Sequence, residues 1–169
     1  TWDIQDMQLP GLDTSIYYGG TGHSGDSYAI TAKGNTIAIA YFAGFADAIL
    51  LKSTDNGDTW IKTTFSDFPV NAYIPDSGLD LDADGAADTV YTTDGSGAIL
   101  IDNNDMVHIT YGNMRVVDGD LTDTYTSYYP GTNGLMYWNE SLGEDLSGTW
   151  VTPSLWDHGN AIVIAASED

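Results

Sequence analysis

The octapeptide at residues 53–60, Ser-Thr-Asp-Asn-Gly-Asp-Thr-Trp, constrains the fold of this chain more than any other feature. Ser53 and Asp55 carry short polar side chains that can hydrogen-bond the backbone N–H groups of a tight turn. Gly57 permits the positive φ that such a turn needs. Strand-forming residues flank the octapeptide, and Trp60 is expected to start the second strand with its ring buried. The octapeptide therefore predicts a hairpin connection between two strands.

The spacing S-x-D-x-G-x-T-W resembles the Asp box of sialidase-type (BNR) repeats. Its fixed positions are Ser53, Asp55, Gly57, Thr59 and Trp60. In that family the box is a structural element of a β-propeller and lies away from the catalytic face. The resemblance therefore implies a propeller fold, and it implies a structural role for these five residues.

Residues 26–68 carry the strand pattern that one propeller blade requires. Short apolar and β-branched runs alternate with turn signals such as Lys33-Gly34-Asn35. Strands are predicted at residues 28–32, 36–42, 48–52 and 60–65. Four antiparallel strands in sequential order make one blade, so the fold class is all-β, with four-stranded antiparallel blades.

The same pattern recurs over residues 97–153 and predicts a second blade. An insertion at residues 113–133 separates its second and third strands, and residues 71–90 connect the two blades. No window has a sustained helical period of apolar residues, so little helix is expected. The second set of strands is predicted at residues 97–101, 106–111, 135–138 and 150–152.

Both ends of the chain are interpreted as parts of further blades. The dipeptide Thr-Trp of the box also begins the chain, and residues 1–10 are interpreted as the end of a preceding blade. Residues 159–167 are interpreted as the first strand of the next blade. Because a closed propeller has about four to eight blades, we expect a fragment of a larger secreted bacterial protein. A β-sandwich of two packed sheets is the alternative.

The net charge of the chain limits the classes of partner that it is expected to bind. Twenty-five acidic and four basic side chains give a formal net charge of −21. A negative field of this size repels nucleic-acid phosphates and anionic membrane surfaces, so nucleic acid is not an expected partner. No apolar run approaches the roughly 18 residues that membrane insertion requires. The acidic balance is compatible with a cation-rich extracellular medium or a cell surface.

Residues 80–88, Asp-Leu-Asp-Ala-Asp-Gly-Ala-Ala-Asp, form a second motif, which points to a hard cation. Ca²⁺ prefers about six to eight oxygen ligands, which closely spaced carboxylates on a bent loop can supply. The motif resembles the D-x-D-x-D-G-x-x-D loops of secreted calcium-binding repeats, and also half an EF-hand loop, although Tyr91 replaces the final glutamate. An acidic loop without an ion is the alternative. The predicted ligands are Asp80, Asp82, Asp84, Asp88 and the carbonyl of Ala86.

Catalysis is not expected from this chain. Sialidases, whose Asp box the octapeptide resembles, bind the carboxylate of their substrate with several arginines and use a tyrosine–glutamate pair as the nucleophile. Arg115 is the single arginine here, so that carboxylate-binding cluster cannot be assembled, and no catalytic residue is assigned. His108 alternates within a predicted strand and is expected to be a packed or hydrogen-bonded residue.

Three tyrosines of the insertion, Tyr125, Tyr128 and Tyr129, form a candidate ligand surface near several aspartates, Asp118 among them. Loop aromatics stack on sugars or anchor protein contacts, but they can equally pack the insertion onto its blade. The sequence thus predicts a calcium-stabilised, non-catalytic extracellular or cell-surface module that scaffolds or binds a glycan or another surface or secretion protein. The alternative is a fragment of a sialidase-like exo-glycosidase whose catalytic residues lie elsewhere. A structural repeat of a surface assembly is a third reading.

Overall fold

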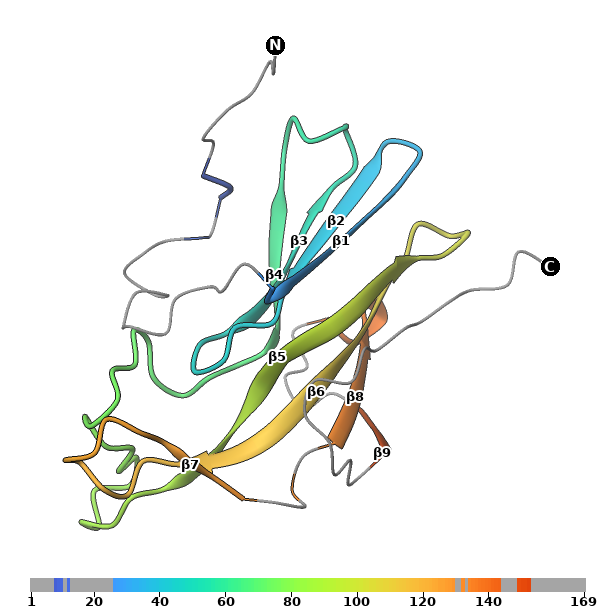
Figure 1. Cartoon of the computed structure of the whole chain (residues 1–169). Coiled ribbons are helices and arrows are strands. Elements are labelled where there is room, and N and C mark those ends of the chain that lie inside the picture. The colour runs from blue at the N-terminus through green and yellow to red at the C-terminus, as the bar shows by residue number, and fades with distance from the viewer. Residues whose placement is uncertain are drawn as a thin grey trace.

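The chain folds into two antiparallel β-sheets, shown in Figure 1. A computed structural model describes residues 8–10, 12, 26–129, 132, 134–143 and 149–152, the last range by its backbone. The predicted strand at residues 159–167 lies outside these residues, as do most of residues 1–10, the predicted end of a preceding blade. The all-β prediction is confirmed for the described part of the chain, and neither sheet closes on itself.

The first sheet is a meander in the order β1-β2-β3-β4. Every neighbouring pair is antiparallel, and the predicted strand positions hold to within one residue. One detail differs, because β4 begins at Ile61 and Trp60 still belongs to the preceding turn. The bounds are β1 (Tyr28–Lys33), β2 (Thr36–Tyr41), β3 (Ala48–Ser53) and β4 (Ile61–Ser66).

The second sheet repeats this arrangement in the order β5-β6-β8-β9, with the short β7 paired to the end of β6. The 3₁₀-helix η1 (Glu140–Leu142) follows β8 and is the one helical segment among the described residues. The bounds are β5 (Thr89–Ile101), β6 (Val107–Val117), β7 (Ser127–Tyr128), β8 (Gly134–Asn139) and β9 (Thr149–Thr152).

Two strands of the second sheet run further than the sequence predicted. Residues 113–117, assigned to the insertion, continue β6 and pair with residues 89–93 of β5. Residues 89–93 are Thr, Val and Tyr, which pack well on a pleated surface, and residues 113–117 end in two valines. The register shifts between Thr93 and Gly97, within β5. The excursion from the sheet is therefore shorter and begins at Asp118.

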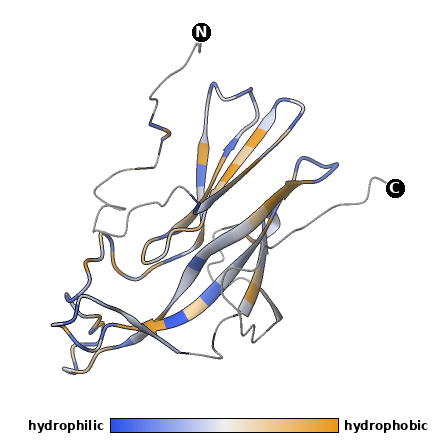
Figure 2. Cartoon of the chain, viewed as in Figure 1, coloured by the Kyte–Doolittle hydropathy of each residue, from blue (hydrophilic) through white to orange (hydrophobic). Residues whose placement is uncertain are grey.

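The two sheets face each other across one hydrophobic core. The first strands meet, because β5 lies beside β1 and β2 (Figure 1). Phe65 of β4 joins the layers, with its ring centroid 5.2 Å from that of Tyr111 and 5.7 Å from that of Trp138. Figure 2 shows hydrophobic segments in the strands of both sheets and hydrophilic residues at the hairpin ends, with further hydrophilic bands along β5 and β6. The buried core comprises Ala38, Ala40, Phe42, Ala48, Leu50, Phe65, Ile101, Val107, Ile109, Tyr111, Met136 and Trp138.

The first sheet also buries its other face. Ile49 and Leu51 alternate with the core-facing residues of β3, and both are fully buried. Leu9 and Leu12 of the N-terminal segment pack against them, together with Ile39. Because both faces of β3 are buried, its sequence contains a continuous apolar run, Ile49-Leu50-Leu51, instead of alternating apolar and polar residues.

Candidate metal centre

The acidic motif lies in the connector between the sheets, which runs from the end of β4 to the start of β5. A second, smaller core fixes this connector. Phe68, Tyr73 and Leu79 are buried there against Val90 of β5 and Val116 of β6. The Tyr73 ring stacks on that of Phe45, with the ring centroids 5.4 Å apart, and this contact extends the core toward the first sheet. The acidic stretch therefore starts from a packed support.

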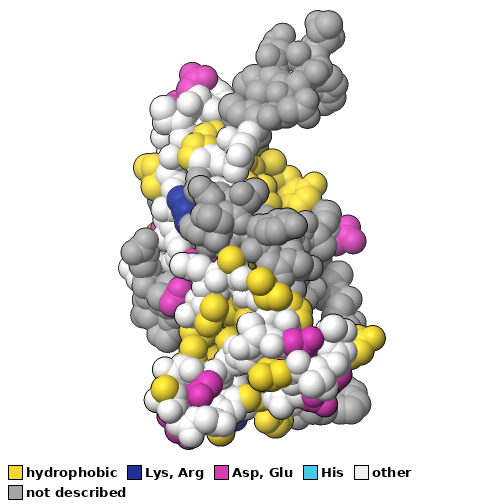
Figure 3. Space-filling model, turned by 90° about the vertical axis from the view of Figure 1, so that its left-hand side faces the viewer, with side chains coloured by type: hydrophobic (Ala, Val, Ile, Leu, Met, Phe, Trp, Pro, Cys, Tyr) yellow, Lys and Arg dark blue, Asp and Glu magenta, His cyan; other side chains and the backbone are white. Residues whose placement is uncertain are grey.

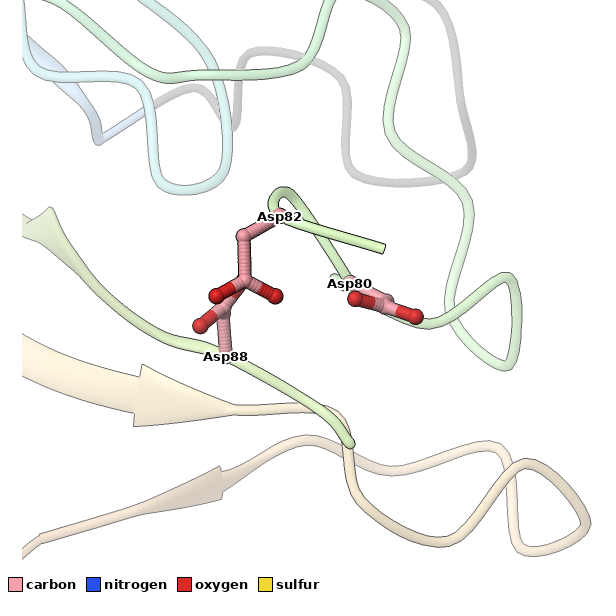
Figure 4. Close-up of side chains that lie close together, drawn as sticks. All are labelled: Asp80, Asp82 and Asp88. Atoms are coloured by element: carbon pink, nitrogen blue, oxygen red, sulfur yellow. The ribbon is translucent and has the colours of Figure 1, made fainter. Parts of the chain in front are cut away.

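Three carboxylates of the motif converge. Asp80, Asp82 and Asp88 each offer an oxygen, and these oxygens lie within 4.8 Å of one another. Figure 4 shows the side chains of Asp82 and Asp88 close together, with Asp80 to one side. Oxygens that share one Ca²⁺ each lie about 2.3–2.6 Å from it, so they are separated by at most about 5 Å. The spacing fits a single hard cation.

The backbone between these residues turns sharply. Ala83 and Gly85 both have positive φ, 60° and 87°. The turn aims amide hydrogens at the first carboxylate, because Asp80 Oδ1 accepts from the Asp84 N–H at 3.1 Å and Asp80 Oδ2 from the Gly85 N–H at 3.0 Å. Each oxygen keeps a lone pair for a cation.

The last carboxylate closes the loop. Asp88 Oδ2 accepts from the Leu81 N–H at 2.7 Å, and the Asp88 N–H donates to the Leu79 carbonyl at 2.5 Å. These two hydrogen bonds hold the end of the loop at Asp88 against its beginning at residues 79–81. Asp88 is consequently half-buried, whereas Asp80 and Asp82 are exposed.

The structure thus unites three of the four predicted carboxylate ligands. Asp84 is not among them, and its Oδ1 accepts from the Ala86 N–H at 2.8 Å. Ala86, the predicted carbonyl ligand, lies on the wall of a neighbouring cavity of about 360 Å³. The cavity is lined by residues 77–80 and 85–87 of the connector and by Asp118, Gly119 and Leu121.

Asp118, at the end of β6, is fully buried beside this cavity. Its Oδ2 accepts from the Tyr73 hydroxyl at 2.7 Å and from the Gly78 N–H at 3.0 Å. Burial of the Tyr73 ring, together with this hydrogen bond, raises the pKa of the Tyr73 hydroxyl above its usual range. Asp118 Oδ1 accepts no hydrogen bond from the described residues. The sequence indicated only that Asp118 was one of several loop aspartates, since spacing does not reveal burial.

The octapeptide forms the turn that its sequence predicted. Ser53 Oγ accepts from the Gly57 N–H at 2.8 Å, and Asp55 Oδ1 accepts from the Thr59 N–H at 2.9 Å. The Thr59 hydroxyl donates to Asp55 Oδ2 at 2.6 Å. These bonds, led by the one from the Thr59 hydroxyl, lower the pKa of Asp55 to about 2. Gly57 has φ of 95°, as predicted.

Trp60 differs from the prediction of a buried ring. The side chain is half-buried and packs beside Ile39, Ile49 and Leu51. Its Nε1 donates to the Gly57 carbonyl at 3.0 Å. The indole is thus tied to its own turn and packs on the outer face of the first sheet, outside the core between the two sheets.

The three loop tyrosines are all exposed but do not share one face. Tyr128 pairs with Val116, whereas the Tyr129 N–H bonds to the Arg115 carbonyl, and consecutive residues of a strand point to opposite faces. Tyr129 instead lies beneath Arg115, whose guanidinium carbon is 5.7 Å from the ring centroid. Tyr91 is the partner of Arg115 on β5, so Tyr91, Arg115 and Tyr129 form an exposed row across three chain segments. This row forms because β5 and β6 pair over residues 89–93 and 113–117, where the sequence predicted no strands.

His108 is hydrogen-bonded, as predicted. Its Nδ1 lies 2.6 Å from the Tyr137 hydroxyl, and its Nε2 lies 3.3 Å from Asp102 Oδ2. Both bonds join neighbouring elements of the second sheet. The arrangement fixes the β5–β6 turn, a structural role.

Comparison of the chain with protein-family models, with curated proteins and with solved structures finds no match. Among the described residues, no helix has the length and apolar character needed to cross a membrane.

Proposed function

We propose that this chain is a calcium-stabilised, non-catalytic β-propeller module of an extracellular or cell-surface protein. The convergence of Asp80, Asp82 and Asp88 in the connector between the two sheets carries the proposal. Three carboxylates this close repel one another, and a divalent cation converts that repulsion into attraction. Calcium bound here would hold the connector in one conformation and so restrict the orientation of the second sheet relative to the first.

The propeller part of the proposal draws on the arrangement of the sheets. The first sheet is a four-stranded meander, and the second has the same order of four strands with the short β7 added to β6. The first strands β1 and β5 lie side by side, and the sheets pack face to face. A propeller places the first strands of neighbouring blades together in this way. The hydrogen-bonded octapeptide, which resembles an Asp box, adds support. Images of the complete protein should show a closed ring of such sheets, whereas an isolated pair of sheets would favour the sandwich.

The proposed ligand surface is the row of Tyr91, Arg115 and Tyr129. Two exposed tyrosines beside a guanidinium offer stacking faces and hydrogen-bond donors of the kind that sugars use. We therefore favour a glycan as the ligand. Tyr129→Ala should lower binding to the oligosaccharide that a glycan array selects at least tenfold, with Tyr28→Ala, exposed on the other sheet, as the matched control. Equal binding by both variants would place the ligand elsewhere.

The exo-glycosidase alternative requires catalytic residues on segments outside this sequence. Hydrolysis of sialosides by the complete protein would favour it. The calcium proposal holds under either alternative, because it concerns the connector alone.

A thermal-shift titration tests the calcium proposal. Calcium should raise the melting temperature of the wild-type chain, and a ligand at one hundred times its Kd stabilises by about 2.7 kcal/mol. Asp82→Asn combined with Asp88→Asn should abolish the rise. The control, Asp26→Asn combined with Asp58→Asn, removes the same charge from exposed positions outside the cluster and should retain it. An unchanged wild-type melting temperature after calcium or chelator addition would refute the site.

A further inference from the structure

Asp118, on the wall of the cavity beside the acidic loop, is a buried carboxylate with one unused oxygen. Asp118 lines the cavity and is 0% exposed, and its Oδ1 has no hydrogen-bond partner among the described residues. Its other oxygen is saturated by Tyr73 and Gly78. Buried polar atoms are nearly always paired, so an orphaned carboxylate oxygen beside a cavity indicates a missing partner.

The missing partner is best explained as a cation. Both donors to Asp118, a tyrosine hydroxyl and a backbone N–H, are neutral, and the described residues that line the cavity include no basic side chain. A second carboxylate, Asp80, lies on the same wall. A buried carboxylate is costly unless a positive charge pairs with it. Figure 3 shows the loop end of the molecule with several acidic side chains and very little Lys or Arg.

We propose that this cavity binds a second calcium ion, with Asp118 Oδ1 as its buried ligand. Ca²⁺ accepts carboxylate, carbonyl and water oxygens together, and a cavity of about 360 Å³ has room for the ion and several waters. Asp80 lines the cavity and also belongs to the three-carboxylate cluster, so it is positioned between the two sites.

A second ion would join two loops that come from different parts of the chain. The connector already contacts the loop after β6, because the Thr124 N–H donates to Asp76 Oδ1 at 3.0 Å and Leu121 packs 3.4 Å from the ideal Cβ position of Gly78. Calcium at Asp118 adds a charged link between the same two loops. That link would order the loop that leads to β7 and Tyr129.

Calcium stoichiometry tests this proposal separately from the loop site. Equilibrium dialysis of the wild-type chain at about 1 mM calcium should find two ions per chain. Asp118→Asn, which keeps an oxygen to accept from Tyr73 and Gly78, should bind one ion. Asp82→Asn combined with Asp88→Asn should also bind one ion, and this variant leaves the buried site intact should Asp118→Asn fail to fold.

Each other outcome has a distinct meaning. One ion in the wild type that Asp118→Asn retains, and that the loop variant loses, would overturn the second site and leave the loop site standing. One ion lost only in Asp118→Asn would overturn the loop site instead. Two ions retained in Asp118→Asn would assign the second ion elsewhere and overturn this proposal.

Terbium luminescence gives a second readout. Tb³⁺ occupies calcium sites, and an ion on Asp118 Oδ1 would lie near the Tyr73 ring, because the Tyr73 hydroxyl donates to the other oxygen of the same carboxylate. Emission excited through tyrosine should fall severalfold in Asp118→Asn and persist in the loop variant. Equal emission from wild type and Asp118→Asn would contradict the assignment.

Discussion

The Lys52 ammonium in β3 lies 2.7 Å from Oε2 of Glu140, the residue that directly follows β8. This ion pair joins the two sheets. Lys52 Nζ also donates to the Asp105 carbonyl at 2.6 Å, and Glu140 Oε2 accepts from the Val107 N–H at 2.7 Å. Lys33 reaches the same β5–β6 turn, where its Nζ donates to the Asp102 carbonyl at 3.0 Å. Two of the four basic residues thus fasten the sheets together.

This ion pair should contribute more than a surface pair does. The two side chains are 17% and 30% exposed, so water screens them only partly. Exposed pairs couple by about 0.2–1 kcal/mol, and we expect about 1–2 kcal/mol here. A double-mutant cycle of Lys52→Met and Glu140→Gln, measured by urea unfolding, gives the value. A coupling energy within error of zero would show that the sheets do not depend on this contact.

Gly97 of β5 should tolerate no side chain. An ideal Cβ at this position would lie 2.2 Å from Phe42 Cζ, a distance that real atoms do not adopt. Phe42 is 1% exposed and cannot move aside, so Gly97→Ala should cost about 3 kcal/mol of unfolding free energy. Gly44→Ala, whose Cβ would lie 3.7 Å from the Thr93 carbonyl oxygen, is the control and should be nearly neutral. Phe42→Leu should partly rescue Gly97→Ala, and purely additive losses would argue against this contact.

Asp55 should make stability depend on pH at the acid end. Its folded pKa is about 2 against an ordinary value of 3.8, so the stabilisation is complete above about pH 5 and is lost as the pH falls from about 4 to about 2. The melting-temperature difference between wild type and Asp55→Asn should therefore shrink as the pH falls from 7 toward 3. Asp58→Asn, an exposed change in the same turn, serves as the control. A pH-independent difference would mean that the lost bonds do not require the ionised form.

Trp60 should stabilise the chain through both its ring and its Nε1 donor. Trp60→Phe loses the bond to the Gly57 carbonyl and should cost about 1 kcal/mol. Trp60→Ala also loses the half-buried ring and should cost about 2–3 kcal/mol, less than for a fully buried tryptophan. Chemical unfolding of the two variants measures both terms, and a neutral Trp60→Ala would remove the indole from any structural role.

The strands and turns were predictable because they depend on neighbours in sequence. The octapeptide forms its own hydrogen bonds within eight residues, and short runs of apolar and β-branched residues such as 36–41 favour strands. The prediction failed where strands needed a distant partner. Residues 113–117 form a strand only because residues 89–93 lie opposite.

Some features of the candidate site were likewise predictable from the sequence, and others depend on contacts between distant residues. The acidic loop was predictable from the sequence, because Asp80, Asp82 and Asp88 are close in sequence and Gly85 supplies the bend. Tertiary structure alone decided that Asp118 is buried against Tyr73, a residue 45 positions away. It likewise placed Arg115 between two tyrosines. Local hydrogen bonds follow from the order of the residues, whereas burial and cross-strand contacts exist only once distant segments pack and exclude water.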